Sequence, residues 1–244
     1  MFNVISIVCV IVKFNTCFVF KVISRQSALD SLSYLVVSIK EKHYRTMSKM
    51  TPNPAKALLR EQIATRIAAL SNEEKKRQSK IVFDKLINHP YYKASNRISL
   101  FMSTDQEIDT APIIEHIRAK GAAAFVPQYA GGVMKMLRLE SGDEQAMPLT
   151  RHGIQQHSKS QQREDALENG GLDLIISPGV VFSKSGDRLG HGGGYYDKFI
   201  TKLRTDFNPP PKVVAIAFDV QVVDNVPMDP QDQKVDDVLF AESS

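Results

Sequence analysis

Cysteine is nearly absent from this sequence of 244 residues, which contains two, Cys9 and Cys17. The rest of the chain therefore has no disulfide, no thiol nucleophile and no thiolate metal site. Long apolar runs are missing as well, because Lys13 interrupts the N-terminal run after Val12, whereas about 20 apolar residues are needed to cross a bilayer as a helix. We expect no stable membrane association.

Several motifs of known chemistry are also missing. No glycine is followed by lysine, as a Walker phosphate loop requires, and neither H-E-x-x-H nor G-x-S-x-G occurs. A dinucleotide fingerprint started at Gly190 would need glycine where Tyr195 stands. These absences argue against a P-loop enzyme, a zinc protease, an α/β-hydrolase and a Rossmann dehydrogenase.

The positive charge is unevenly distributed. The chain has 31 Lys and Arg against 27 Asp and Glu, a net charge of +4. Residues 1–46 hold six Lys and Arg and two acids, so the whole excess lies there and residues 47–244 are neutral. A neutral domain does not favour nucleic-acid binding. We therefore expect no nucleic-acid partner, and an RNA-binding role is the weakest alternative.

The N-terminal stretch, residues 1–46, also suggests a domain boundary. We predict that residues 1–46 are an N-terminal extension outside the fold and that residues 47–244 form one domain, since Met47 and Met50 precede a regular pattern. An optional extension, an organelle-targeting segment and a weak membrane anchor all remain open for residues 1–46. We expect a cytoplasmic protein, or a mitochondrial one if this segment is a targeting sequence.

Periodicity and capping residues predict the elements of the domain. Asn53 with Pro54, and Ser71 with Glu74, begin two helices, and Gly121 ends another. The predicted helices are 54–70, 72–88, 109–120 and 195–204. The predicted strands are 97–103, 122–128, 133–140, 172–179, 213–218 and 235–240, with a long connection over 141–170. Helices alternating with strands predict an α/β fold, a single layered domain whose mostly parallel sheet is flanked by helices.

A glycine-rich segment, GDRLGHGGGYYDKF over 186–199, lies between a buried strand and a helix. Glycines allow the backbone to approach a ligand closely, and the amides at a helix start attract anions. Arg188 and His191 lie among the glycines. The segment therefore predicts a phosphate-binding loop.

Charged residues elsewhere could complete such a site. Asp197 could bind Mg²⁺ beside phosphates if a second carboxylate, from the acidic turn that includes Asp232, lay nearby. Lys56 and Arg60 stand one helical turn apart and could meet a polyphosphate together. Glu107 follows a predicted strand, where α/β sheets tend to place ligand groups. Each of these residues taken alone is also compatible with an ordinary surface position.

The sequence resembles the 5-formyltetrahydrofolate cyclo-ligase family. The resemblance rests on DRLGHGGGYYDKF with the preceding GLDLIISPGVVFSKSG, on AKALLREQIATRIAALSNEEKKRQS and RISLFMSTDQEID, and on the final KVDDVLF. These motifs occur in the family's order and span about residues 53–241.

The resemblance implies an ATP- and Mg²⁺-dependent enzyme of one-carbon metabolism. It would convert 5-formyltetrahydrofolate, including polyglutamylated forms, to 5,10-methenyltetrahydrofolate with release of ADP and phosphate. Phosphorylation of the formyl oxygen creates a leaving group, and the second folate nitrogen then closes the ring. Such chemistry asks the protein mainly for positioning and charge neutralisation. We expect a monomer.

The resemblance also implies the residues of the site. Those implied for catalysis are Arg60, Arg188 and Tyr195. Those implied for ATP are Lys56, Ala57, Leu58, Leu59, Arg60, Arg188, Leu189, Gly190, His191, Gly192, Gly193, Gly194, Tyr195 and Tyr196. Those implied for the folate are Arg60, Met102, Glu107, His191, Gly192, Gly193, Gly194 and Tyr195. Those implied for Mg²⁺ are Asp197 and Asp232.

Two departures from the family's pattern bear on activity. The stretch from His152 to Gln156 stands where an aromatic residue and an I-P-x-P element often cover the folate, and His191 stands where arginine is frequent. A folate- or nucleotide-binding protein without turnover is therefore the main alternative to the enzyme.

Overall fold

Helices cover both faces of a six-stranded sheet in the computed structural model of the protein, which describes residues 53–150 and 153–242. The strand order is β3-β2-β1-β4-β7-β8, and every pair is parallel except β2 with β3. The strands are β1 (Arg97–Ser99), β2 (Ala123–Ala130), β3 (Val133–Arg138), β4 (Leu174–Ser177), β7 (Lys212–Ile216) and β8 (Asp237–Leu239). The predicted fold class, a layered α/β domain with a mostly parallel sheet, is confirmed.

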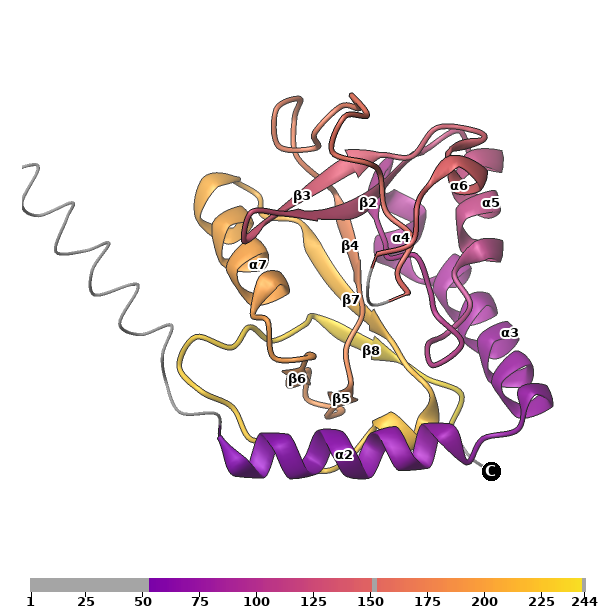
Figure 1. Cartoon of the computed structure of the whole chain (residues 1–244), viewed down its shortest axis with the longest axis vertical. Helices are drawn as coiled ribbons and strands as arrows, with labels where there is room; N and C mark the ends of the chain where they lie inside the picture. The colour runs from indigo at the N-terminus through magenta and orange to yellow at the C-terminus, as the bar shows by residue number, and fades with distance from the viewer. Residues whose placement is uncertain (1–52, 151–152, 243–244) are drawn as a thin grey trace, which may run out of the picture. The chain divides into compact units, whose positions relative to one another are not determined.

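The remaining elements surround this sheet (Figure 1). The helices are α2 (Pro54–Ala68), α3 (Asn72–Asn88), α4 (Pro90–Ala94), α5 (Ala111–Ala119), α6 (Asp143–Ala146), α7 (Tyr195–Asp206) and the 3-10 helix η1 (Asp219–Gln221). A separate antiparallel hairpin consists of β5 (Val181–Phe182) and β6 (Arg188–Leu189). No helix within the described ranges is long and apolar enough to cross a membrane.

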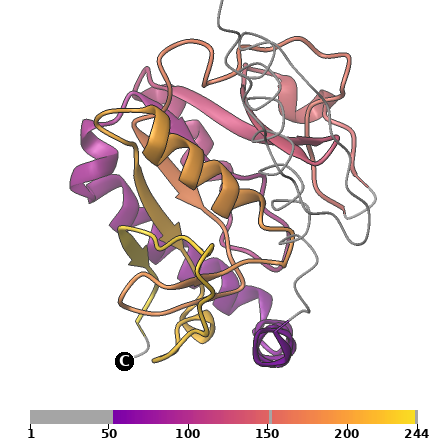
Figure 2. The same cartoon turned by 90° about the vertical axis from the view of Figure 1, so that its left-hand side faces the viewer.

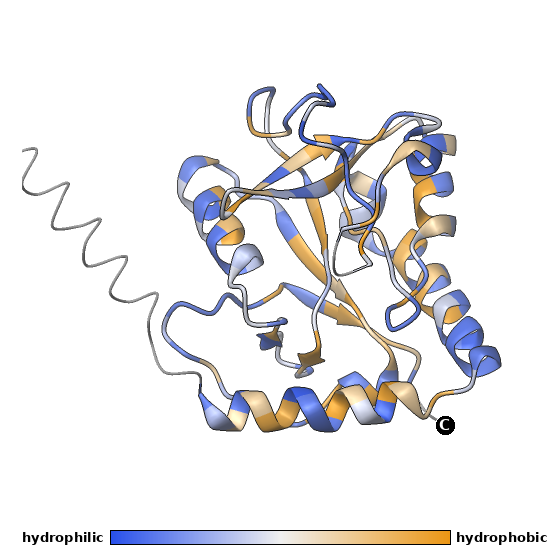
Figure 3. Cartoon of the chain, viewed as in Figure 1, coloured by the Kyte–Doolittle hydropathy of each residue, from blue (hydrophilic) through white to orange (hydrophobic). Residues whose placement is uncertain are grey.

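Alternating side chains of the strands form two hydrophobic cores. Ile98, Leu174 and Val214 pack in one cluster with residues of α2, α3 and α5. Their neighbours Ile175 and Val213 pack in the other cluster with residues of α7. Figures 2 and 3 show α7 across the sheet from α3 and α5, with apolar strands between them. This period of two follows from strand geometry, and each fully buried aliphatic side chain stabilises the fold by about 1.5–3 kcal/mol.

Two helices begin at the capping residues that the sequence analysis identified. The side chain of Asn53 accepts a hydrogen bond from the Ala55 amide, and that of Ser71 accepts one from the Glu74 amide at 3.1 Å. A short helix that is not among the predicted elements, α4, begins at Pro90. Proline occupies the first helical position there, where its missing N–H costs nothing, and the His89 ring caps the Tyr91 amide.

Other boundaries differ from the predictions for identifiable reasons. The strand predicted over 97–103 ends at Ser99, because the following backbone bonds to Thr110, whose hydroxyl donates to the Phe101 carbonyl at 2.9 Å. The connection over 141–170 contains α6, whose buried Asp143 is held by Arg163. The predicted extension, residues 1–46, lies outside the described residues.

Candidate functional site

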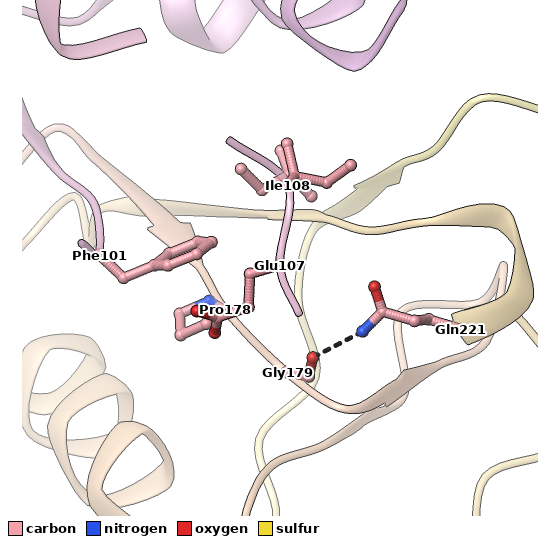
Figure 4. A pocket seen from close by; sticks show the side chains of 7 residues that line it. Phe101, Glu107, Ile108, Pro178, Gly179 and Gln221 are labelled. Atoms are coloured by element: carbon pink, nitrogen blue, oxygen red, sulfur yellow. Dashed lines mark hydrogen bonds between the residues drawn. The ribbon is translucent and has the colours of Figure 1, made fainter. Parts of the chain in front are cut away.

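A pocket lies where three adjacent parallel strands, β1, β4 and β7, end. Its lining residues come from the end of β7, from the segments after β1 and β4 and from η1 (Figure 4): Phe101, Glu107, Ile108, Pro178, Gly179, Ile216 and Gln221. Ligands of open α/β sheets bind at this carboxyl edge. The pocket therefore lies at the position that the topology favours for a binding site.

Glu107 is the carboxylate of this pocket, as its position after β1 predicted. Its Oε2 accepts hydrogen bonds from the Thr104 amide at 3.0 Å and from the Thr104 hydroxyl at 3.1 Å. Burial raises the pKa of Glu107, and the Thr104 hydrogen bonds and the nearby charge of His191 offset part of this effect. His191 of the glycine loop is therefore close enough to the pocket to lower the pKa of Glu107.

The hairpin of β5 and β6 precedes the glycine loop and was not predicted. Leu189 and Arg188 pair with Val181 and Phe182, so Arg188 and Leu189 belong to a strand and not to a loop. Arg188 is only 3% exposed. Its Nη2 donates to Oδ1 of Asp197 at 2.7 Å, and its guanidinium lies over the Tyr196 ring at 5.6 Å. The structure therefore shows Arg188 holding the first turn of α7, and its predicted contact with ATP stays a prediction.

The loop itself runs from Gly190 to Gly194 and leads into α7. Gly194 adopts a left-handed conformation, with φ of 65°, and no side chain caps the helix. The first amides of α7 therefore lack a side-chain cap and could bind an anion. Arg60 of α2 reaches this loop, because its Nε donates to the Gly190 carbonyl at 2.7 Å. Arg60 therefore lies beside the glycine loop, and its predicted contact with a polyphosphate stays a prediction.

Lys56, one turn before Arg60, contacts the acidic turn. Its Nζ lies 2.8 Å from Oδ2 of Asp229 and forms a second ion pair with Asp232. Burial lowers the pKa of Lys56, but the hydrogen bonds and charges of Asp229 and Asp232 outweigh this and raise it overall. The same ammonium lowers the pKa of Asp229. Lys56 therefore remains charged, with the two carboxylates as its partners.

Asp197 and Asp232, the predicted Mg²⁺ ligands, lie close together. The amide of Gln233, which follows Asp232, donates to Oδ1 of Asp197 at 3.0 Å. Asp197 accepts its hydrogen bonds at Oδ1, and Asp232 accepts its hydrogen bonds at Oδ2. The other oxygen of each carboxylate is left for a ligand. In the described part of the chain no group of three or more His, Cys, Asp or Glu side chains could hold a metal. Two carboxylates suit Mg²⁺ that arrives with phosphate oxygens and water.

Gln156, the last residue of the stretch that departs from the family's pattern, lies beside β2. Gln156 pairs with the backbone of Tyr129, accepting from its amide at 3.2 Å and donating to its carbonyl at 3.4 Å. The Tyr129 ring in turn meets the Tyr195 ring edge-on, at 5.0 Å between centroids. Burial raises the pKa of Tyr129 to about 12, so its hydroxyl stays protonated. The sequence analysis did not single out Tyr129, which follows the predicted strand 122–128 and belongs to β2 in the structure.

Some predicted residues do not gather at the pocket. Ala57 and Leu58 are exposed on α2, with Leu58 56% accessible. Leu59 and Met102 are half-buried and pack against the first hydrophobic cluster. Their predicted contacts with ATP and folate stay predictions.

The chain is an α/β domain in which a glycine loop leads into an uncapped helix start, with Arg60 of α2 on the loop and a carboxylate in the first turn of the helix, an arrangement typical of phosphate-binding sites. The chain belongs to the 5-formyltetrahydrofolate cyclo-ligase family, whose sequence model matches residues 52–241. The match includes the pocket, the glycine loop and the acidic turn.

Individual relatives agree with this assignment. The chain is 42% identical over 200 residues to the mouse 5-formyltetrahydrofolate cyclo-ligase, covering 81% of this chain and 98% of the mouse protein. It is 35% identical over 189 residues to a probable 5-formyltetrahydrofolate cyclo-ligase of Caenorhabditis elegans, covering 76% and 92% respectively. The solution structure of Aquifex aeolicus 5,10-methenyltetrahydrofolate synthetase matches with a TM-score of 0.64 and 26% identity, covering 77% of this chain and 90% of that one.

Proposed function

We propose that this protein converts 5-formyltetrahydrofolate to 5,10-methenyltetrahydrofolate, using ATP and Mg²⁺ and releasing ADP and phosphate. The observation that carries the proposal is the meeting of two different subsites at one sheet edge. The carboxylate of Glu107 suits a heterocycle with N–H donors, and the glycine loop with Arg60 suits a polyphosphate. The electrostatic effect of His191 on the pKa of Glu107 supports a short separation between the two subsites.

In this proposal the chain's own residues bind and orient the reactants. The amides at the start of α7 and the guanidinium of Arg60 neutralise phosphate charge, and Asp197 and Asp232 hold Mg²⁺. Bound ATP supplies the phosphoryl group that makes the formyl oxygen a leaving group. No nucleophilic side chain is required, in keeping with a site built from backbone amides, cations and carboxylates.

Direct assay of the purified full chain tests the proposal. Mixing it with 5-formyltetrahydrofolate, ATP and Mg²⁺ is expected to form the near-UV-absorbing methenyl product together with one ADP per turnover. Omitting ATP or chelating Mg²⁺ should abolish product formation. Tight folate binding without any product would instead support the alternative of a binding protein, with turnover lost through the departures at 152–156 and His191.

The raised pKa of Glu107 leads to a pH-dependent prediction. A carboxyl whose pKa is raised in the folded protein becomes neutral at a higher pH than an ordinary glutamate, whose pKa is about 4.3. The neutral form accepts hydrogen bonds from the folate less well, so KM for the folate is expected to rise as the pH falls toward that raised pKa. Steady-state kinetics between about pH 5 and 8 measures this rise.

Glu107→Gln identifies the group responsible. This variant should have a KM raised about tenfold or more at neutral pH, as expected for loss of a charge-assisted hydrogen bond, and the acid-side rise should disappear. Glu168→Gln, at an exposed glutamate, is the matched control and should behave as wild type. An unchanged pH profile in Glu107→Gln would remove Glu107 from the folate subsite.

Further expectations concern the setting of the enzyme. We propose that it acts as a monomer without a nucleic-acid partner and accepts polyglutamylated folate. Light scattering of the purified chain, and a comparison of KM for mono- and polyglutamylated substrates, test these points.

We also propose a cytoplasmic location, or a mitochondrial one if residues 1–46 direct it. Imaging of the full chain and of residues 47–244, each with a C-terminal tag, separates these two locations.

A further inference from the structure

Gln221 lines the pocket, and both N–H donors and the oxygen of its side chain form hydrogen bonds inside the protein. It is 3% exposed. Its Nε2 donates to the Gly179 carbonyl at 2.9 Å and to the Val180 carbonyl at 3.2 Å, and its Oε1 accepts from the Phe218 amide at 2.8 Å. Figure 4 shows the amide reaching Gly179 across the pocket wall. Both donors and the acceptor of this amide therefore fix backbone.

The segment that Gln221 holds is closely packed. A Cβ on Gly179 would lie 2.5 Å from Cζ of Phe182 and 3.3 Å from Cγ of Arg188, so only glycine allows these side chains to pack against it. Pro178, the preceding residue, also lines the pocket, and its carbonyl accepts a hydrogen bond from Nη1 of Arg188 at 3.4 Å. The turn after β4 thus forms the pocket wall on one side and supports Arg188 on the other.

The helix that carries Gln221 is anchored independently of the pocket. Gln78 of α3 accepts from the Asp219 amide at 2.9 Å and donates to Oδ1 of Asp219 at 2.6 Å. Gln78 is 1% exposed. The 3-10 helix η1 is therefore held to α3 at its first residue and holds the turn after β4 at its last residue, Gln221.

We propose that Gln221 is a positioning residue for the folate pocket, which it shapes by fixing the wall of Pro178 and Gly179 beside Glu107. This inference rests on the proposed function of that pocket. Gln221 itself touches no reactant. Its loss should therefore affect the fit of the folate far more than the fit of ATP, because the Arg188 side chain has its own anchor on Asp197.

Gln221→Met tests this role, since methionine keeps the length of the side chain and removes all three hydrogen bonds. We expect KM for 5-formyltetrahydrofolate to rise about tenfold, because buried hydrogen bonds that hold the pocket wall are lost. KM for ATP should change less than about twofold. A purely structural role would lower the active fraction and leave both KM values unchanged. Gln221→Asn, which is one methylene shorter and cannot span Phe218 and Gly179 together, should give a smaller rise in the same KM.

Tyr92→Phe is the matched control. The Tyr92 hydroxyl bonds Nδ1 of His116 at 2.8 Å in a position 1% exposed and away from the pocket lining, so this variant should lose stability with both KM values unchanged. Wild-type folate KM in folded Gln221→Met and Gln221→Asn, or an equal rise in the ATP KM, would overturn the positioning role. Inactive wild-type protein would instead overturn the proposed function.

Discussion

Asp197→Asn is expected to lower kcat by about 100-fold or more, the size of effect typical for removing a group that stabilises charge in the transition state. Asp197 is the proposed Mg²⁺ ligand in the first turn of α7. Asparagine keeps an oxygen that can accept from Arg188 and from the Gln233 amide, both of which bond Oδ1 of Asp197. The substitution therefore removes the charge with little change to the local hydrogen bonds.

Asp197→Ala would be a poorer test. Arg188 is 3% exposed and pairs with Asp197, and removing one partner of a buried ion pair costs about 3–5 kcal/mol of stability. Loss of activity in Asp197→Ala could therefore reflect unfolding. The alanine variant is expected to show a clearly lower Tm, whereas Asp197→Asn should remain close to wild type in thermal unfolding.

The measurement for Asp197→Asn is methenyl product formation at saturating folate and ATP, repeated over a range of Mg²⁺ concentrations. We expect a reduced kcat and a higher Mg²⁺ requirement. Asp206→Asn is the control on the same helix, because Asp206 forms an exposed pair with Lys202 at 2.6 Å, and such pairs contribute about 0–1 kcal/mol. Wild-type turnover by folded Asp197→Asn would contradict the role assigned to this carboxylate.

Arg60→Ala is expected to reduce kcat/KM for ATP by about 100-fold or more, since a guanidinium beside transferred phosphate supplies charge that no neighbour replaces. Its Nε holds the Gly190 carbonyl at 2.7 Å, and its Nη2 lies 3.7 Å from the position a Cβ on Gly192 would take. The side chain therefore lies along the glycine loop. Its loss should affect both the order of the loop and the neutralisation of phosphate.

Arg60→Lys separates these two contributions. Lysine restores a positive charge but not the planar fork with its Nε donor, so we expect only partial recovery of kcat/KM for ATP. Arg66→Ala, at an exposed position of the same helix, should match wild type in both kinetics and Tm. Full activity of Arg60→Ala would show that α2 contributes packing alone.

Much of the fold could be predicted because its signals are local. Asn53 and Ser71 cap helices through amides two and three residues away, so a short stretch of sequence contains all the relevant atoms. The continuous apolar run LDLIISPG predicted a central strand, and all four residues of β4 are buried. The glycines from Gly190 to Gly194 predicted the loop before α7. The overlooked helix α4 also had a local signal, a proline at its first position.

The composition of the site required the tertiary structure. Lys56 meets Asp229 and Asp232 across 173 and 176 residues of sequence, and Gln221 holds Gly179 across 42. No local spacing predicts such pairs, because the sheet topology decides which loops meet at its carboxyl edge. Arg188 illustrates the difference, since the sequence indicated a cation in a phosphate loop and the structure shows a buried guanidinium paired with Asp197.

The sequence by itself thus determined most of the helices and strands, the glycine loop and the neutral, cysteine-free character of residues 47–244, since each depends on residue types or on near neighbours. Only the tertiary structure decided which charged groups pair, which of them face the pocket and which residues hold its wall. The physical reason is that desolvation and hydrogen-bond geometry act between segments that are close in space, whatever their separation in the chain.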